Sequence, residues 1–380
     1  MKPSLPRRPP REEDFFGHLR DERVAARLGL ALGLAFGIAF VTGVLSHLIQ
    51  HPPWWFSWPT RPVSLYRVTQ GLHVIAGTVA IPLLLAKLYS VYPKLFTWPP
   101  VRSVPHALER ASVLVLVASA FFELATGLLN IAQAYPWSFF FPAAHYAVAY
   151  VVMGSILVHV AVKLPVIRRA LGERLDQHEP VDGLPGRRAF LAGTGAAALA
   201  AYLATAGQTV PLLRHVSVLA PRTGEGPQGL PVNKSAAAAG VLDIARDPGY
   251  RLVVSGPAGE TRLSLAELQA MPQHEEDLPI ACVEGWSAVG RWTGVRVSDL
   301  LDLVGAPPNA DVAVESLQPR GLYRASVLPS VHARDPLTLL ALSLNGEPLD
   351  PDHGFPCRVI APSRPGVLQT KWVASLRVRA

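Results

Sequence analysis

Long apolar stretches separated by short polar or aromatic segments dominate the first half of the sequence. Each stretch is nearly free of charge and has the length of about 20 residues that an α-helix needs to cross a bilayer. We therefore predict five membrane spans, over residues 27–46, 69–89, 111–131, 146–164 and 189–210. Glu123 places an ionisable group inside the third span, where such groups are candidates for function.

The pattern changes after residue 211 to short runs bounded by Gly, Pro and Asp. The runs "YRLVVSG", "VAVESL" and "CRVIAP" combine β-branched residues with turn residues at their ends, which is typical of strands. Residues 263–271 and 297–304 have the apolar spacing of short amphipathic helices. The predicted fold class is an all-α transmembrane bundle of five spans followed by a mixed α/β (α+β) domain.

Charge orients the spans. The chain carries a net charge of +7, and its Lys and Arg residues gather before residue 27, between 89 and 111, and between 164 and 189, whereas residues 130–144 have none. Basic loops stay in the cytoplasm. We therefore expect a bacterial cytoplasmic membrane protein with a cytoplasmic N-terminus. This topology explains the positive charge, so we expect no nucleic-acid partner.

The resulting domain organisation has five parts. From the N-terminus, these parts are a cytoplasmic tail, a four-helix membrane domain, a cytoplasmic loop, a fifth span and an extracytoplasmic domain. Their predicted boundaries are 1–26, 27–165, 166–188, 189–210 and 211–380.

Histidines in the membrane part have the spacing of haem ligands. His145 and His159 are 14 residues apart on the fourth span, which corresponds to about 40° around a helix and about 21 Å along it. They therefore share one face near opposite membrane surfaces, and imidazole is a usual axial ligand of haem iron. For an outer haem the predicted pair is His73 and His145, with His47 as a competitor.

For an inner haem the predicted pair is His106 and His159, and His18 lies further out. Structural, hydrogen-bonded histidines are the alternative at each position. Residues of about 20–165 resemble the di-haem cytochrome b subunits of respiratory dehydrogenases, which have this paired spacing. The resemblance implies one or two b-type haems and exchange of electrons with the quinone pool.

The most informative stretch of the outer domain is "ACVEGWSAVGRWTGVRVSDLL", in which Cys282 follows a strand-like segment and enters a loop. A soft thiolate there suits a transition metal. Together with "LLALSLNGEPLDPDHGFPCRVIAPSRPGVLQTKWVASLRV", this stretch resembles the sulfite-oxidase family of molybdopterin enzymes. The resemblance implies a mixed α and β fold in which Cys282 ligates molybdenum and Tyr323, in "LYRASV", is an active-site tyrosine.

The same resemblance implies the residues that hold the molybdopterin. In this role it implies His353, Arg358, Lys371 and Gly366 and, from shorter matches, Ser316 and Asn233. A guanidinium and an ammonium suit a phosphate. Cys357 occupies a position that is apolar in the family, so we expect it in the core, and a Cys282–Cys357 disulfide would remove the proposed ligand.

The residues around Cys282 do not decide between two classes of substrate. "CVEGWS" is closer to the methionine-sulfoxide-reductase branch of the family than to the sulfite-oxidising branch, which has an Arg-rich segment after its Cys. Tyr323, in contrast, resembles the sulfite-oxidising branch. The small-molecule substrate is therefore expected to be sulfoxide-like or a sulfur oxyanion.

An internal "PGRRAFLAGTG" precedes the fifth span. Two arginines followed by Phe-Leu and a mildly apolar run are the pattern of a twin-arginine export signal, which moves folded proteins. A cofactor domain that folds in the cytoplasm requires such a route, so the twin-arginine translocase is an expected partner during assembly. The alternative is that Arg187 and Arg188 are ordinary cytoplasmic anchors.

These observations predict a membrane-bound molybdopterin-dependent oxidoreductase. A second hypothesis is a haem-free membrane anchor that carries a binding or assembly module, or an enzyme with a separate electron partner. A transporter is disfavoured because the spans show no inverted repeat.

Overall fold

The computed structural model of the protein describes residues 19–175, 186–219 and 226–379, together with residues 11, 12, 15 and 17. The chain forms two compact units. One consists of Met1–Val44, Leu72–Gly207 and Leu212–Leu219, and the other of Leu45–Gly71, Gln208–Pro211 and Ala220–Ala380. The segment that joins the first two long helices therefore belongs to the unit of the C-terminal domain, which the predicted boundaries did not anticipate.

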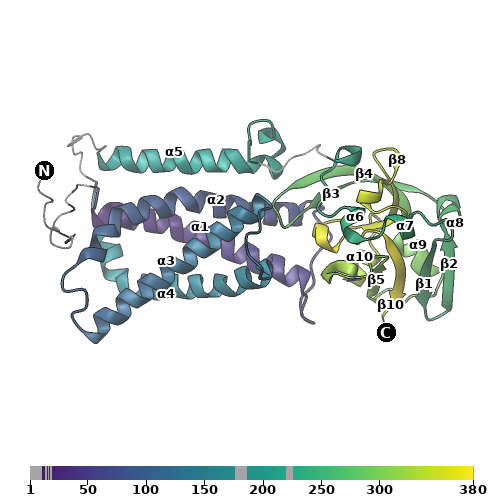
Figure 1. Ribbon diagram of the computed structural model, residues 1–380, viewed down its shortest axis with the longest axis horizontal. Coiled ribbons are helices and arrows are strands. Elements are labelled where there is room, and N and C mark those ends of the chain that lie inside the picture. Colours follow the sequence, from purple (N-terminus) through teal and green to yellow (C-terminus); the bar gives the residue numbers. More distant parts are fainter. Residues whose placement is uncertain are drawn as a thin grey trace, which may run out of the picture. The chain divides into compact units, whose positions relative to one another are not determined.

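Long helices account for most of the first unit (Figure 1). They are α1 (Glu22–Gln50), α2 (Leu65–Val91), followed by the short η2 (Tyr92–Phe96), α3 (Val104–Ile131), α4 (Phe141–Gly172) and α5 (Arg187–Thr205). The first four are long and apolar enough to cross a membrane. α5 is a helix of 19 residues rich in Ala and Gly. Because α5 is less hydrophobic, the fifth span stays a prediction.

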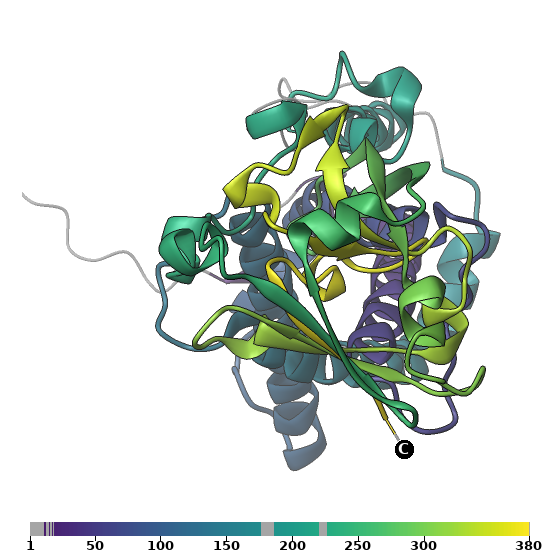
Figure 2. The ribbon, with the colours of Figure 1, turned by 90° about the vertical axis from the view of Figure 1, so that its right-hand side faces the viewer.

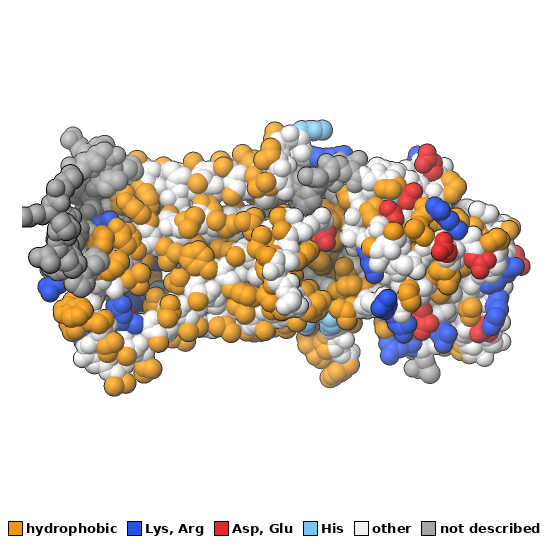
Figure 3. All heavy atoms as spheres, viewed as in Figure 1, with side chains coloured by type: hydrophobic (Ala, Val, Ile, Leu, Met, Phe, Trp, Pro, Cys, Tyr) orange, Lys and Arg blue, Asp and Glu red, His pale blue; other side chains and the backbone are white. Residues whose placement is uncertain are grey.

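The helices of this unit bury both small and large apolar side chains, such as Leu28 and Phe36, and expose other large ones. Ala80, Ala120 and Val152 are buried in a common cluster, as expected where helix backbones approach closely in a membrane. Leu30 and Leu114 are among the exposed large side chains. Figure 3 shows hydrophobic side chains covering the helices, whereas charged side chains gather over the C-terminal domain. The exposed apolar surface is what a lipid environment requires.

The C-terminal domain contains two sheets with short helices, one sheet of mixed and one of antiparallel topology (Figure 2). One sheet has the order β2-β1-β10-β5-β6, and in it β1 and β10 are parallel while the other pairs are antiparallel. Its strands are β1 (Arg251–Gly256), β2 (Gly259–Ser264), β5 (Val312–Ser316), β6 (Ala325–Leu328) and β10 (Val373–Val378). The strands predicted from "YRLVVSG" and "VAVESL" are β1 and β5.

The second sheet has the order β3-β4-β7-β8, with β9 also paired to β7. Its strands are β3 (His274–Ala281), β4 (Ser287–Arg296), β7 (Leu339–Leu344), β8 (Glu347–Pro348) and β9 (Arg358–Ile360). Gly294 on β4 is required by close approach, since a Cβ there would lie 2.1 Å from the Leu340 carbonyl oxygen. The predicted strand "CRVIAP" is β9.

Short helices close the domain. They are α6 (Ala236–Ala239), α7 (Leu242–Ala245), α8 (Leu265–Ala270), α9 (Val297–Asp302) and α10 (Ser330–Ala333). α8 begins with a capping box in which Ser264 and Glu267 satisfy each other's backbone N–H groups. α8 and α9 are the two helices predicted in this domain. The large core cluster beneath α9 includes Leu300, Val314, Leu340 and Cys357, so Cys357 is a core residue, as expected.

Replacement of a core leucine should destabilise the C-terminal domain. Leu340 on β7 is 0% exposed and Leu303, after α9, is 49% exposed. We expect Leu340→Ala to cost about 2–5 kcal/mol because it leaves a cavity, and Leu303→Ala to cost less than about 0.5 kcal/mol. Urea titration monitored by tryptophan fluorescence measures both, and equal costs would contradict this assignment of the core.

Candidate functional site

Cys282 lies in a tight turn directly after β3. Its backbone N–H donates to the Trp286 carbonyl at 2.8 Å, and its carbonyl accepts from the Gly285 N–H at 3.1 Å. The side chain is 1% exposed, and Cys282 and Cys357 are both free thiols. Burial, together with the nearby Glu284 carboxylate, raises the pKa of the Cys282 thiol. A bound metal cation would instead lower the pKa of the thiol and coordinate it as the thiolate.

Tyr323, from another part of the chain, lies within electrostatic reach of Cys282. It lies on η6 (Leu322–Arg324), the short turn before β6. Burial and the neighbouring Cys282 raise the pKa of the Tyr323 hydroxyl. The two predicted catalytic residues are therefore within electrostatic reach of each other, and the neutral phenol of Tyr323 can donate a hydrogen bond.

Lys371 contacts several of the other residues that were predicted to bind the pterin. Its ammonium donates to the carbonyls of Lys234 and Asp352, at 2.6 and 2.9 Å, and reaches Asn233 Oδ1 at 3.4 Å. The Ser316 hydroxyl donates to the Lys371 carbonyl at 2.8 Å. Burial and the nearby Arg358 lower the pKa of Lys371 to about 7, and Cys282 lies within electrostatic reach of its ammonium.

His353 and Arg358 complete this set. His353 Nε2 lies 2.7 Å from the Pro227 carbonyl, to which it must donate because a carbonyl can only accept. Burial lowers the pKa of the imidazole to about 4 and keeps it neutral. Arg358 is 3% exposed and stacks 5.0 Å from the Trp292 ring. Its two terminal nitrogens donate to the His353 and Gln369 carbonyls, while Nε has no hydrogen-bond partner among the described residues.

A further buried cation, Arg364, was not predicted. Its guanidinium donates to the Val327 and Leu368 carbonyls, at 2.6 and 3.1 Å. Burial lowers the pKa of Arg364 to about 10 and that of Arg358 to about 9. No local sequence pattern could identify Arg364, because its hydrogen-bond partner Val327 is far away in the sequence.

These cations fit an anionic cofactor. Within the described part of the chain, no carboxylate lies at ion-pair distance from Arg358, Arg364 or Lys371. Burying a cation without an opposite charge is costly, and the unpaired Arg358 Nε is a free donor. A phosphate-bearing pterin would supply the missing negative charge.

Gly366 is placed differently from the other pterin candidates. It begins η8 (Gly366–Leu368), and a Cβ on it would lie 3.1 Å from the Ala281 carbonyl oxygen and 3.8 Å from Cys282 Cα. Pro365 also forms a bridge with Ala281. The small residue thus lets this loop lie directly against the Cys282 turn.

In the helical unit, His73 and His145 face each other with ring centroids 6.2 Å apart. His73 Nδ1 lies 2.8 Å from the Ala39 carbonyl. The two nitrogens of His145 lie 3.0 Å from Thr126 Oγ1 and 3.1 Å from Glu123 Oε2. The predicted outer pair is therefore adjacent, and the intramembrane Glu123 is its neighbour. The competitor His47 stacks on His51 at 4.7 Å.

His106 and His159 of the predicted inner pair both lie within electrostatic reach of Glu109. The Arg102 backbone N–H donates to His106 Nδ1 at 3.2 Å, and Glu109 forms an ion pair with Lys163. His18 lies outside the described residues. In the described ranges, no three His, Cys, Asp or Glu side chains gather as a metal-ion site.

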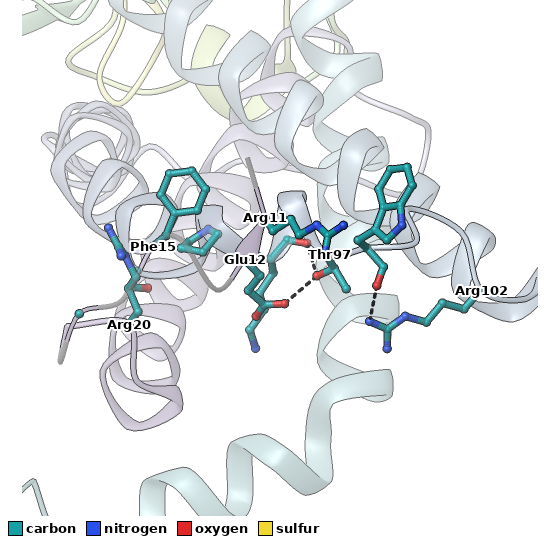
Figure 4. Close-up of a pocket in the computed structure, with 11 residues that line it drawn as sticks. Arg11, Glu12, Phe15, Arg20, Thr97 and Arg102 are labelled. Atoms are coloured by element: carbon teal, nitrogen blue, oxygen red, sulfur yellow. Dashed lines mark hydrogen bonds between the residues drawn. The ribbon is translucent and has the colours of Figure 1, made fainter. Parts of the chain in front are cut away.

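A cavity of about 510 Å³ lies elsewhere in the helical unit (Figure 4). Its labelled lining includes Arg11, Arg20 and Arg102, and Thr97 Oγ1 donates to Glu12 at 2.9 Å. None of the predicted site residues lines it.

Comparison with known proteins assigns the class of the C-terminal domain. Residues 239–380 match the family described as "Oxidoreductase molybdopterin binding domain". This part of the chain is therefore similar to the molybdopterin-binding domains of oxidoreductases, in agreement with the resemblance of the sequence.

Individual relatives agree with this class. The mitochondrial sulfite oxidase of Rattus norvegicus is 33% identical over 159 residues, which cover 34% of this chain and 29% of the relative. A putative protein-methionine-sulfoxide reductase subunit YedZ1 of Azospira oryzae is 35% identical over 130 residues, 34% of this chain and 48% of the relative. The chain thus spans less than half the length of either relative.

Among solved structures, the sulfane dehydrogenase SoxCD of Paracoccus pantotrophus is 22% identical. It has a TM-score of 0.32 and covers 34% of this chain and 38% of its own. At this TM-score the similarity does not support an inference about fold or function.

The lowered pKa of Lys371 predicts a pH dependence for the cofactor-free protein. Between about pH 7 and 10 the unfolded lysine keeps a proton that the folded one has lost, so stability should rise with pH, by at most about 1.4 kcal/mol per unit. Thermal midpoints at pH 7, 8 and 9 measure this, with Lys371→Gln flattening the rise. The same slope in both proteins would contradict it.

Proposed function

We propose that this protein is a membrane-bound oxidoreductase in which a molybdenum–molybdopterin cofactor exchanges electrons between a small extracytoplasmic substrate and the quinone pool through b-type haem. The observation that carries the proposal is the buried Cys282 thiol, with Tyr323 and Lys371 both within its electrostatic reach. Four helices on the same chain are long and apolar enough to cross a membrane and would attach such a site to it.

The chain's own residues have separable tasks in this proposal. The bound cofactor would supply two-electron, oxygen-atom chemistry. Cys282 would be the thiolate ligand, and Tyr323 would donate its hydroxyl proton in a hydrogen bond to the substrate. Lys371, Arg358 and the neutral His353 would hold the pterin, and burial of the Cys282 turn would keep water away.

The substrate we favour is a neutral sulfoxide. Glu284 lies beside the Cys282 thiol, and its carboxylate accepts from Trp286 Nε1 at 3.1 Å. A fixed negative charge there disfavours an anion such as sulfite. One relative is a putative methionine-sulfoxide reductase subunit, which agrees with this preference, although the sulfite oxidases keep the oxyanion open as the alternative.

For the haem, the proposed outer ligands are His73 and His145. The Ala39 carbonyl beside His73 Nδ1 would orient that ring and leave Nε2 for iron. Thr126 would do the same for His145, whose Nε2 would leave Glu123 on haem binding. His106 and His159 are the proposed inner pair. A haem-free anchor remains the second candidate function.

Metal analysis separates these candidates. Detergent-purified full-length protein from a host that makes the cofactor should contain about one molybdenum and one or two b-type haems per chain. Molybdenum without haem would support the haem-free anchor. The absence of both molybdenum and haem would overturn the proposal.

Loss of an outer ligand should remove one haem signal. We expect His145→Ala to abolish the outer-haem contribution to the reduced-minus-oxidised spectrum, because iron would lose an axial ligand. His47→Ala is the matched control and should keep the spectrum. An unchanged spectrum in His145→Ala would refute the assignment.

Export through the twin-arginine route is also part of the proposal. α5 begins at Arg187, which forms a 2.9 Å ion pair with Asp21. A double Arg→Lys change at Arg187 and Arg188 keeps the charge but should prevent transfer of the C-terminal domain, because that route requires the arginine pair. The same change at Arg168 and Arg169 is the control. Protease added to spheroplasts should digest the domain in the control only; digestion in both would contradict the export signal.

A further inference from the structure

The segment Leu45–Gly71 is bound to the C-terminal domain at several points within one compact unit. Trp58 Nε1 donates to the Ser363 carbonyl and hydroxyl, both at 2.9 Å. The Ser363 N–H donates to the Val63 carbonyl at 3.0 Å. Arg61 forms two hydrogen bonds with the buried Asp335, at 2.8 and 3.0 Å. The segment is therefore part of the domain's structure and not only a connection between spans.

Ser363 belongs to the loop that lies against the Cys282 turn. It is buried and has a φ of +56°, a left-handed conformation that costs a non-glycine residue energy. Two residues later, Pro365 bridges to Ala281. Trp58 and Val63 thus hold a strained loop in place on one side of Cys282.

The first turns of α2 also contact the Cys282 turn. Tyr66 is 1% exposed and packs in a cluster with Ile49 and Ala281, the residue before Cys282. Its hydroxyl accepts or donates a 3.2 Å hydrogen bond with Ser46, and Cys282 and Tyr323 are within its electrostatic reach. A residue from the start of a membrane helix therefore borders the predicted catalytic pair.

Gln70, one turn further along α2, binds the residue that follows Cys282. Its Nε2 donates to the Val283 carbonyl at 3.3 Å, the side chain is 6% exposed, and Oε1 has no partner among the described residues. Because a carbonyl can only accept, the amide nitrogen must face Val283 and Oε1 must face away. A buried acceptor without a partner calls for an O–H or N–H group from a bound molecule.

We propose that Leu45–Gly71 is a wall of the molybdenum site and that Gln70 is a positioning residue for Cys282, acting through the Val283 carbonyl. This inference rests on the proposed function. By fixing the peptide next to the thiolate, Gln70 sets the direction of the sulfur. Its free Oε1 accepts a hydrogen bond from water or from a donor group of the substrate.

The test compares Gln70→Leu with Gln273→Leu in the full-length protein. Gln273 also donates its amide to backbone carbonyls, of Leu268 and Met271, but lies after α8. Molybdenum content, the Mo(V) electron paramagnetic resonance spectrum, and kcat and KM for dimethyl sulfoxide with reduced benzyl viologen are measured. We expect Gln70→Leu to keep molybdenum, shift the Mo(V) spectrum and lower kcat about 10-fold or more. Gln273→Leu should match the wild type.

The outcomes separate this inference from the proposed function. A wild type without molybdenum would overturn both. A molybdenum-loaded wild type whose Mo(V) spectrum and kcat equal those of Gln70→Leu would overturn the inference alone. If Gln70→Leu does not accumulate, the nearly isosteric Gln70→Glu, which cannot donate to Val283 as a carboxylate, should show the same shift. Loss of molybdenum in both variants would assign Gln70 a merely structural role and overturn the inference too.

Discussion

Buried positive charge that meets no carboxylate among the described residues is the constraint on which the C-terminal domain depends. Arg358 and Arg364 are held by backbone carbonyls, and Lys371 adds a third cation whose proton is loosely held. Carbonyls lower the cost of burying these charges but do not cancel it. An anionic cofactor would cancel this cost, so its binding would stabilise this region.

The two sheets explain how this site can exist. The end of β3 delivers Cys282, β9 begins with Arg358, and β10 starts directly after Lys371 and Trp372. The loop that contains Ser363 and Gly366 then lies on the Cys282 turn, where only a small residue fits. Strand pairing fixes the backbone directly before Cys282, at Arg358 and directly after Trp372, which would give a metal ligand a rigid support.

In the helical unit, polar groups are organised around the histidines. His73 and His145 each have a hydrogen-bonding partner on a neighbouring helix, Ala39 and Thr126 respectively. Such partners orient imidazole rings whether or not a metal is bound. Glu123, an expensive residue at this depth, lies where it can interact with His145.

Local pattern alone determined much of this protein. The apolar runs gave four helices able to span a membrane, the alternating runs gave β1, β5 and β9, and one cysteine in a loop with a family resemblance gave the candidate metal ligand. The roles of Arg364, Tyr66 and Gln70 were decided only by the tertiary structure. Gln70 and Val283 are 213 residues apart, and a contact over that separation leaves no periodicity or spacing in the sequence, because it exists only once both segments have folded into one unit.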